Sequence, residues 1–280
     1  MLCTRWMLAP PTVLWLLLAL VITPRASAFV QQQHFVRHSR PLRAAAAAVS
    51  MAGDRNKTIC FIRHGVTEMN EFLGSSHYGS PGFKDPGLWD TRLTARGIAQ
   101  AEVLNRRLHS HASAWAQTNE EIELVVSSPL SRALHTATLA FAGEPLSRIP
   151  RCINADVRER MWLSSDVGSP AGDLAEAWGK ENWDCSALEN TWWYTDESWR
   201  SGGVDWRKPG QYVHVGEPEQ PFKQRLENFK AWLLARPELC IAVVAHWGSI
   251  YGLTGKSLEN CEMLRISLSE FIDLPVLATD

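Results

Sequence analysis

Residues 59–70, I-C-F-I-R-H-G-V-T-E-M-N, hold a short apolar run that ends in an arginine, a histidine and a glycine. The run up to Ile62 has the length and β-branched content of a strand buried on both faces, as in parallel sheets. Arg63 and His64 then stand at the carboxyl end of that strand, where ligands bind in open α/β sheets. Gly65 permits a tight turn after them. The stretch predicts a strand that ends at a functional site, with a plain charged loop as the alternative.

The composition is that of a globular protein with one large domain. The chain has 280 residues, of which 45% are hydrophobic and 21% are charged. Residues 1–53 contain five arginines and no acid, which leaves 23 basic against 30 acidic residues in 54–280. This acidic excess argues against a nucleic-acid-binding surface, so any bound anion must meet a local cluster of positive charge.

The cysteines predict free thiols in a reducing compartment and neither a disulfide framework nor a structural zinc site. Their spacing contains no C-x-x-C pair, and an odd number remains once the leader is set aside. The six are Cys3, Cys60, Cys152, Cys185, Cys240 and Cys261.

The first 53 residues read as a two-part targeting sequence. Residues 1–28 have the charged, hydrophobic and small-residue parts of a signal peptide, and residues 29–53 have the arginine-rich, acid-free composition of a transit peptide. The pair resembles the presequences of algae with secondary plastids, so we expect plastid import, with no stable membrane anchor. Secretion is the alternative, and the sequon at Asn56 would then matter.

After the opening strand, the pattern alternates between helices and strands. Residues 71–92 are rich in glycine and proline and predict a loop, and Thr94 can cap a helix that runs to about Leu108. A strand over 123–128 comes next. Ser128 is the expected N-cap of the following helix, which places Arg132 in its first turn, where phosphate binds favourably.

The second half of the chain contains an irregular insertion and a second buried strand. Residues 162–221 carry seven tryptophans and predict an insertion with its own small aromatic core over one edge of the sheet. The strand C-I-A-V-V-A, 240–245, ends in His246 and repeats the arrangement at His64. Residues 263–271 predict a last, edge-like strand. The chain is therefore expected to form a three-layer α/β/α sandwich with a mostly parallel central sheet.

These motifs together resemble the histidine phosphatase superfamily, also called phosphoglycerate-mutase-like. The pattern R-H-G-x-T-x-x-N runs from Arg63 to Asn70, and S-S-P-L-x-R-A-x-x-T-A begins at Ser127. Glu159 and His246 follow in the order of the family. The resemblance covers residues 58–271, and the domain is expected to span 54–280.

The resemblance implies a metal-independent phosphomonoester hydrolase without a cofactor. His64 would be the nucleophile that becomes phosphohistidine, Arg63, Arg132 and His246 would cradle the phosphoryl group, and Glu159 would be the general acid and base. Its substrate would be a phosphorylated small molecule. Added contacts to that substrate are expected from Asn70, Arg160 and Trp247.

Two departures from the family pattern leave alternatives open. Val66 stands where many members carry Glu or Gln, and Trp247 replaces the usual small residue after the second histidine. After Arg160 the chain lacks the tyrosine-glycine continuation of true mutases, so hydrolysis is favoured over phosphoglycerate-mutase-type transfer. A non-catalytic relative that binds a phosphorylated ligand is the third possibility. Neither the natural substrate nor the oligomeric state follows from the sequence.

Overall fold

The computed structural model describes residues 57–115, 121–196 and 216–279. The targeting sequence expected over 1–53 and the part of the insertion from 197 to 215 lie outside the described residues, so both targeting assignments stay predictions. Within the described ranges, no helix combines the length and hydropathy needed to cross a bilayer.

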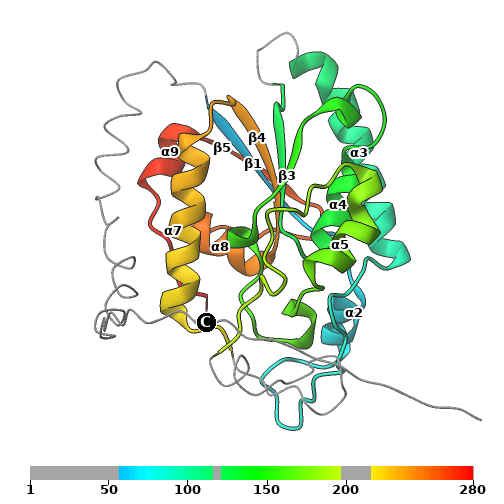
Figure 1. Ribbon diagram of the computed structural model, residues 1–280, viewed down its shortest axis with the longest axis vertical. Coiled ribbons are helices and arrows are strands. Elements are labelled where there is room, and N and C mark those ends of the chain that lie inside the picture. The colour runs from blue at the N-terminus through cyan, green and yellow to red at the C-terminus, as the bar shows by residue number, and fades with distance from the viewer. Residues whose placement is uncertain (1–56, 116–120, 197–215, 280) are drawn as a thin grey trace, which may run out of the picture. The chain divides into compact units, whose positions relative to one another are not determined.

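A five-stranded sheet forms the centre of the fold, with strand order β3-β2-β4-β1-β5 (Figure 1). All neighbouring strands are parallel except β5, which runs antiparallel to β1 at the edge. The prediction of a mostly parallel sheet is therefore confirmed. The strands are β1 (Thr58–Arg63), β2 (Leu124–Ser127), β3 (Arg151–Ile153), β4 (Cys240–Ala245) and β5 (Met263–Ser267).

Helices cover both faces of this sheet, which confirms the three-layer sandwich. Alternate side chains of β1 enter different cores: Cys60 and Ile62 pack with α3, α4 and α5, whereas Ile59 and Phe61 pack with α7, α8 and α9. Figure 1 shows α7 and α9 on one side of the sheet and α3 to α5 on the other. The helices are α2 (Glu68–Ser75), α3 (Ala95–Trp115), α4 (Ser131–Ala140), α5 (Ala171–Trp178), α7 (Glu219–Ala235), α8 (Trp247–Thr254) and α9 (Leu268–Asp273).

The loop expected over 71–92 begins instead inside a helix, α2. Thr67 caps this helix by accepting a hydrogen bond from the backbone N–H of Asn70, whose side chain in turn accepts one from the backbone N–H of Thr67. This reciprocal cap starts the helix despite the glycine in its last turn. Helix α3 also extends past its expected end at Leu108.

The helix that carries Arg132 begins two residues later than expected, so the assignment of Ser128 as its N-cap is wrong. Leu130 has extended dihedral angles and precedes the first turn of α4. The buried carboxylate of Asp90, which lies in a distant loop, caps the helix in place of a local side chain. It accepts hydrogen bonds from the backbone N–H and the hydroxyl of Ser131, both 2.7 Å. Arg132 nevertheless lies in the first turn, as predicted.

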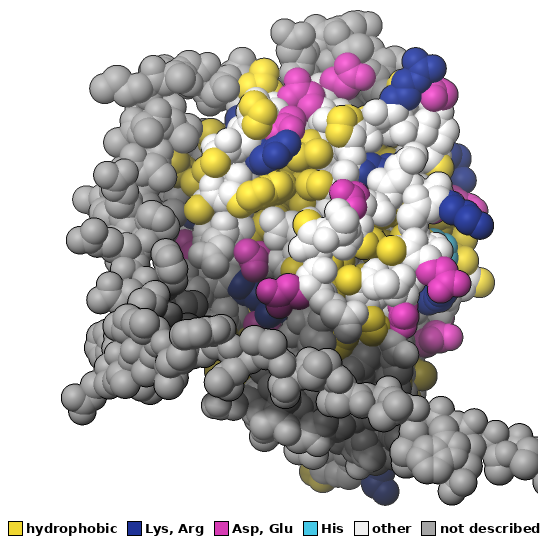
Figure 2. All heavy atoms as spheres, viewed as in Figure 1, with side chains coloured by type: hydrophobic (Ala, Val, Ile, Leu, Met, Phe, Trp, Pro, Cys, Tyr) yellow, Lys and Arg dark blue, Asp and Glu magenta, His cyan; other side chains and the backbone are white. Residues whose placement is uncertain are grey.

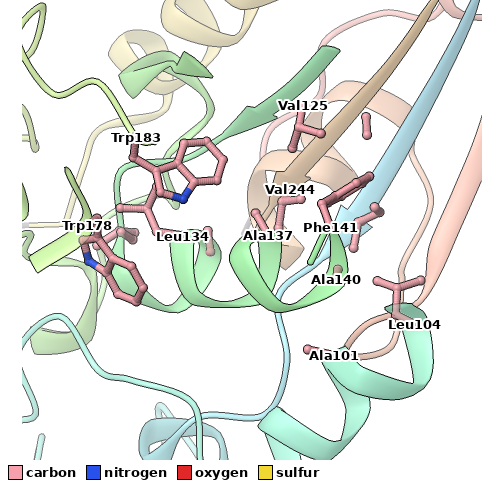
Figure 3. Close-up of a cluster of buried hydrophobic side chains, with 14 of the residues drawn as sticks. Ala101, Leu104, Val125, Leu134, Ala137, Ala140, Phe141, Trp178, Trp183 and Val244 are labelled. Atoms are coloured by element: carbon pink, nitrogen blue, oxygen red, sulfur yellow. The ribbon is translucent and has the colours of Figure 1, made fainter. Parts of the chain in front are cut away.

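The tryptophan-rich segment has no separate core in its described part, contrary to expectation. Trp178, Trp183, Trp192 and Trp193 are buried in the same cluster as Leu134 of α4, and Figure 3 shows two of these indoles beside that helix. Large rings on an irregular segment gain most by extending an existing apolar core.

The expected placement over a sheet edge holds for Trp183. The guanidinium of Arg151, on edge strand β3, lies 5.6 Å from the Trp183 ring centroid.

The last predicted strand is shorter than expected. Strand β5 ends at Ser267, whose hydroxyl accepts a hydrogen bond from the backbone N–H of Glu270 and so starts α9. A serine followed three residues later by glutamate is a capping-box signature.

On the face shown in Figure 2, acidic and basic side chains of the described residues lie interspersed.

Candidate active site

The two histidines that follow buried strands meet at one edge of the sheet. Strands β1 and β4 are parallel neighbours in register, with Arg63 opposite Ala245, so the residues after them emerge together. The ring centroids of His64 and His246 lie 5.1 Å apart. A cavity of about 270 Å³ opens at this edge, and His64 lines it together with Arg63 and Arg132.

His64 is held in one tautomer. Its Nδ1 lies 2.8 Å from the backbone oxygen of Gly65, which can only accept, so Nδ1 carries the proton and Nε2 keeps its lone pair. Burial lowers the pKa of His64 well below its usual value, and the positive charges of Arg132 and Arg63 lower it further. The imidazole is therefore neutral at physiological pH.

The turn after His64 needs glycine because of close backbone contact. A Cβ atom on Gly65 would lie 2.7 Å from the carbonyl oxygen of Gly97, and a Cβ on Gly97 would lie 2.1 Å from that of Val66. The backbone N–H of Gly65 also donates to the hydroxyl of Thr136 on α4, at 3.0 Å. The start of α3 and the middle of α4 thus fix the position of His64.

Arg63 lines the cavity and is anchored from behind. Its Nη1 donates to the backbone oxygen of Leu258 at 2.8 Å, which anchors one side of the guanidinium. Its Nε is buried and has no hydrogen-bond partner in the described part of the chain. A buried donor without a partner costs about 1–3 kcal/mol.

Three hydrogen bonds hold the guanidinium of Arg132 in place. It donates from Nε to Nδ1 of His246 at 3.2 Å, from Nη1 to the backbone oxygen of Ser165, and from Nη2 to the carboxylate of Asp166 at 2.9 Å. Each Nη group has a second hydrogen, so the fork can still bind an anion. Asp166 in turn accepts from the backbone N–H groups of Trp162 and Leu163.

His246 is fully buried and does not line the cavity. Its Nδ1 accepts from Arg132, so its Nε2 carries the proton and donates to the hydroxyl of Ser128 at 2.8 Å. Burial and the charge of Arg132 hold the pKa of His246 well below its usual value. The structure therefore places His246 behind Arg132, as a neutral support for that arginine and for the ring of His64.

Glu159 lines the cavity with both carboxylate oxygens engaged. Oε1 accepts from the backbone N–H of Arg160 at 2.8 Å, and Oε2 accepts from that of Gly248 at 3.0 Å. Burial raises the pKa of Glu159, as does the nearby charge of Asp166, and these effects outweigh the two hydrogen bonds. The site thus pairs a neutral imidazole with a carboxyl group whose pKa is raised.

Comparison with known protein families identifies the family of this chain. The family model of the histidine phosphatase superfamily, branch 1, matches residues 59–270. The chain belongs to the histidine phosphatase superfamily.

The chain is also similar to individual proteins that are named as phosphatases or as phosphoglycerate mutases. The Arabidopsis thaliana phosphoglycerate mutase-like protein 1 is 27% identical over 222 residues, which cover 74% of this chain and 73% of that protein. Among solved structures, the α-ribazole phosphatase of Shigella flexneri is 24% identical, with a TM-score of 0.45 over 79% of this chain and 96% of that one. The phosphoglycerate mutase of Thermus thermophilus is 19% identical, with a TM-score of 0.40 over 79% and 96%.

The three residues that were expected to contact the substrate all line the cavity. Asn70 uses its side-chain oxygen to cap α2, which leaves its amide NH₂ group for a ligand. Arg160 donates instead to the backbone oxygens of Glu217 and Thr279, so it builds the cavity wall. Trp247 is 37% exposed and is the largest of the three side chains.

Val66, which departs from the family pattern, does not line the cavity. The Val66 side chain is buried, and it is absent from the cavity wall. Its backbone N–H donates to the side chain of Gln100 at 3.0 Å. The residue therefore supports the turn after His64.

Asp166, Ser165 and Gly248 are site residues that sequence reasoning missed. A Cβ atom on Gly248 would lie 2.3 Å from Oε1 of Glu159, so only glycine lets the carboxylate reach the start of α8. Gly248, two residues after His246, was a visible signal, whereas nothing near Asp166 in sequence marked its contact with Arg132. Among the described residues, no group of three or more His, Cys, Asp or Glu side chains is arranged to hold a metal ion.

Proposed function

We propose that this protein is a phosphomonoester hydrolase that acts without a metal cofactor and forms a phosphohistidine at His64. The observation that carries the proposal is the hydrogen bond from Nδ1 of His64 to the backbone oxygen of Gly65. It leaves the Nε2 lone pair as nucleophile on a residue that lines the cavity. A depressed pKa keeps that lone pair unprotonated.

In the first step, Nε2 of His64 attacks phosphorus and the bond from phosphorus to the ester oxygen breaks. Arg63 and Arg132 hold the phosphoryl oxygens and balance their charge. Glu159 gives its proton to the departing alkoxide, which leaves as an alcohol. The raised pKa of Glu159 supports its role as this acid.

In the second step, the Glu159 carboxylate takes a proton from water as the water oxygen attacks phosphorus. The phosphorus–nitrogen bond breaks and inorganic phosphate leaves. His64 returns to its neutral form, and its Nδ1 still donates a hydrogen bond to the backbone oxygen of Gly65. Glu159 is protonated again and ready for the next ester.

The test is phosphate release from 4-nitrophenyl phosphate in EDTA by the wild-type protein, His64→Ala and His109→Ala. His109 lies on α3 and outside the cavity lining, so its variant controls for the loss of a ring. We expect equal release by wild type and His109→Ala and none above background by His64→Ala. Equal rates for all three proteins would disprove the mechanism.

A second assay separates the alternatives that the sequence leaves open. Incubation with 3-phosphoglycerate reports a mutase if the 2-isomer forms without phosphate release. Binding of inorganic phosphate without turnover of any ester would indicate a non-catalytic relative. We expect neither result.

A further inference from the structure

Three aromatic side chains from different parts of the chain line the cavity beside the arginines. Tyr78 comes from the segment after α2, Trp162 from the segment after Glu159, and Trp247 from the start of α8. Leu73 and Leu163 add apolar surface to the same wall. The lining thus combines the arginines beside the neutral His64 with apolar and aromatic side chains.

Each aromatic ring is held in place by a neighbour. Trp247 stacks on Tyr251 with ring centroids 5.4 Å apart and donates from Nε1 to the hydroxyl of Ser257 at 2.8 Å. Tyr78 contacts Phe83 edge to face at 5.4 Å. Rings that are already ordered lose little entropy when a ligand packs against them.

Trp162 is fixed from two sides. The guanidinium of Arg160 lies 4.5 Å from its ring centroid, and a Cβ atom on Gly216 would lie 2.4 Å from its Cζ3. The backbone N–H of Trp162 also donates to Asp166, the residue that holds Arg132. Trp162 is therefore linked to Arg132 through Asp166.

The charges of the described lining match a single phosphate group. They comprise Arg63, Arg132 and Arg160 against Glu159 and Asp166. With Glu159 protonated, as an acid must be, three positive charges face one negative charge, a balance of +2. A phosphomonoester carries up to −2 at neutral pH. A second anionic group on the substrate would find no matching cation in this part of the chain and would be repelled by Asp166.

We propose that the substrate is a phosphomonoester of an uncharged alcohol that bears a planar aromatic ring, with the ring packed against Trp247, Trp162 and Tyr78. This inference rests on the proposed function of the same site. The cavity volume of about 270 Å³ is just below the range typical of drug-sized ligands, which fits one phosphate and a small ring system.

The test compares three primary alkyl phosphates, whose alcohols are leaving groups of the same class: 3-phenylpropyl, n-propyl and 3-carboxypropyl phosphate. We expect kcat/KM for the phenyl ester to exceed that of the propyl ester about tenfold or more, since the ring adds stacking and burial. The carboxylate ester should be slower than the propyl ester. Trp247→Leu should reduce the ratio of phenyl to propyl at least threefold.

Trp232→Leu is the matched control. Trp232 stacks on Phe229 in α7 and does not line the cavity, so its variant should keep the wild-type ratio. Release from all three esters at similar rates, or a ratio that Trp247→Leu leaves unchanged, would overturn the aromatic substrate class and leave the phosphatase proposal standing. No release from any ester, including 4-nitrophenyl phosphate, would overturn both proposals.

Discussion

Glu159 accepts two backbone hydrogen bonds and still has a raised pKa, which suits a group that must donate a proton. We predict that Glu159→Gln lowers kcat/KM for alkyl phosphates about 10²–10⁴-fold. The loss should be much smaller for 4-nitrophenyl phosphate, because its leaving group needs no proton. Steady-state kinetics with both esters measure the difference. A variant that retains full activity on alkyl phosphates would remove Glu159 from the acid role.

Asp166 raises the pKa of Glu159 through its negative charge, in addition to the larger effect of burial. Because the acid must be protonated, activity falls as the pH rises through that pKa. Asp166→Asn removes the charge, so the Glu159 pKa should fall and the alkaline limb of kcat/KM should move to lower pH. A profile against pH with an alkyl phosphate measures this shift.

Asp173→Asn, an exposed position on α5, is the control for that profile. Its alkaline limb should coincide with that of the wild type. A limb that stays in place or moves to higher pH in Asp166→Asn would contradict the electrostatic coupling between Asp166 and Glu159.

The start of α8 is an element whose sequence serves the site directly. Gly248→Ala would place a Cβ atom 2.3 Å from Oε1 of Glu159, so the carboxylate must move. We predict a loss of kcat/KM for alkyl phosphates on the order of 10²-fold, since small misplacements of catalytic groups have effects of that size.

Gly172→Ala, in α5, is the matched substitution because no atom lies within 4 Å of its new Cβ. It should keep wild-type activity and gain up to about 1 kcal/mol of helix stability. If Gly248→Ala were as active as Gly172→Ala, the close contact with Glu159 would have no role in catalysis.

Sequence periodicity predicted the elements that carry the site better than the contacts within it. The strands before His64 and His246 are continuous apolar runs, and parallel strands bring their carboxyl ends together, so the meeting of the two histidines followed from the sequence. The sequence also placed Arg132 correctly in the first turn of α4, although it did not predict the residue that caps this helix. Asp90, which caps that turn, lies in a remote loop, and no local pattern can predict such a contact.

Two errors arose where another interaction outweighed the signal read from the sequence. Glycine and proline after Gly74 favoured a loop, but the reciprocal cap of Thr67 and Asn70 started α2 first. The tryptophans suggested a separate core, yet burial against α4 removes more of their surface from water than an isolated cluster could.

At the scale of the whole molecule, a buried charge network ties α7 to the segment that carries Glu159. Glu217 is fully buried and pairs with Arg158 and Arg225, and Arg225 also donates to the backbone oxygens of Arg158 and Glu159. Burial alone would raise the pKa of Glu217, but hydrogen bonds and charge from Arg225 and Arg158 hold it below its usual value.

We predict that Glu217→Gln lowers the free energy of unfolding by about 3–5 kcal/mol, because two arginines lose their buried counter-charge. Urea denaturation measures this change. Glu219→Gln, which breaks only an exposed pair with Lys223, should cost about 0.5 kcal/mol or less. Equal stabilities of the two variants would contradict the structural role of the network.

The same network determines how the stability of the protein changes as the pH falls. The folded pKa of Glu217 lies below the unfolded value, so its contribution is fully present above the unfolded pKa and is lost as the pH falls through the folded pKa. Glu217→Gln should therefore lose less stability than the wild type when the pH is lowered through that window.

The central claim is that His64 carries the phosphoryl group between the two steps. The most direct measurement is rapid mixing with an alkyl phosphate, quenching in alkali, and mass spectrometry of the peptide that contains His64. We predict a mass increase of one phosphoryl group on that peptide, located to His64 by fragmentation. Turnover by the wild-type protein with no modified His64 peptide at any quench time, or with the phosphoryl group on another residue, would contradict the account.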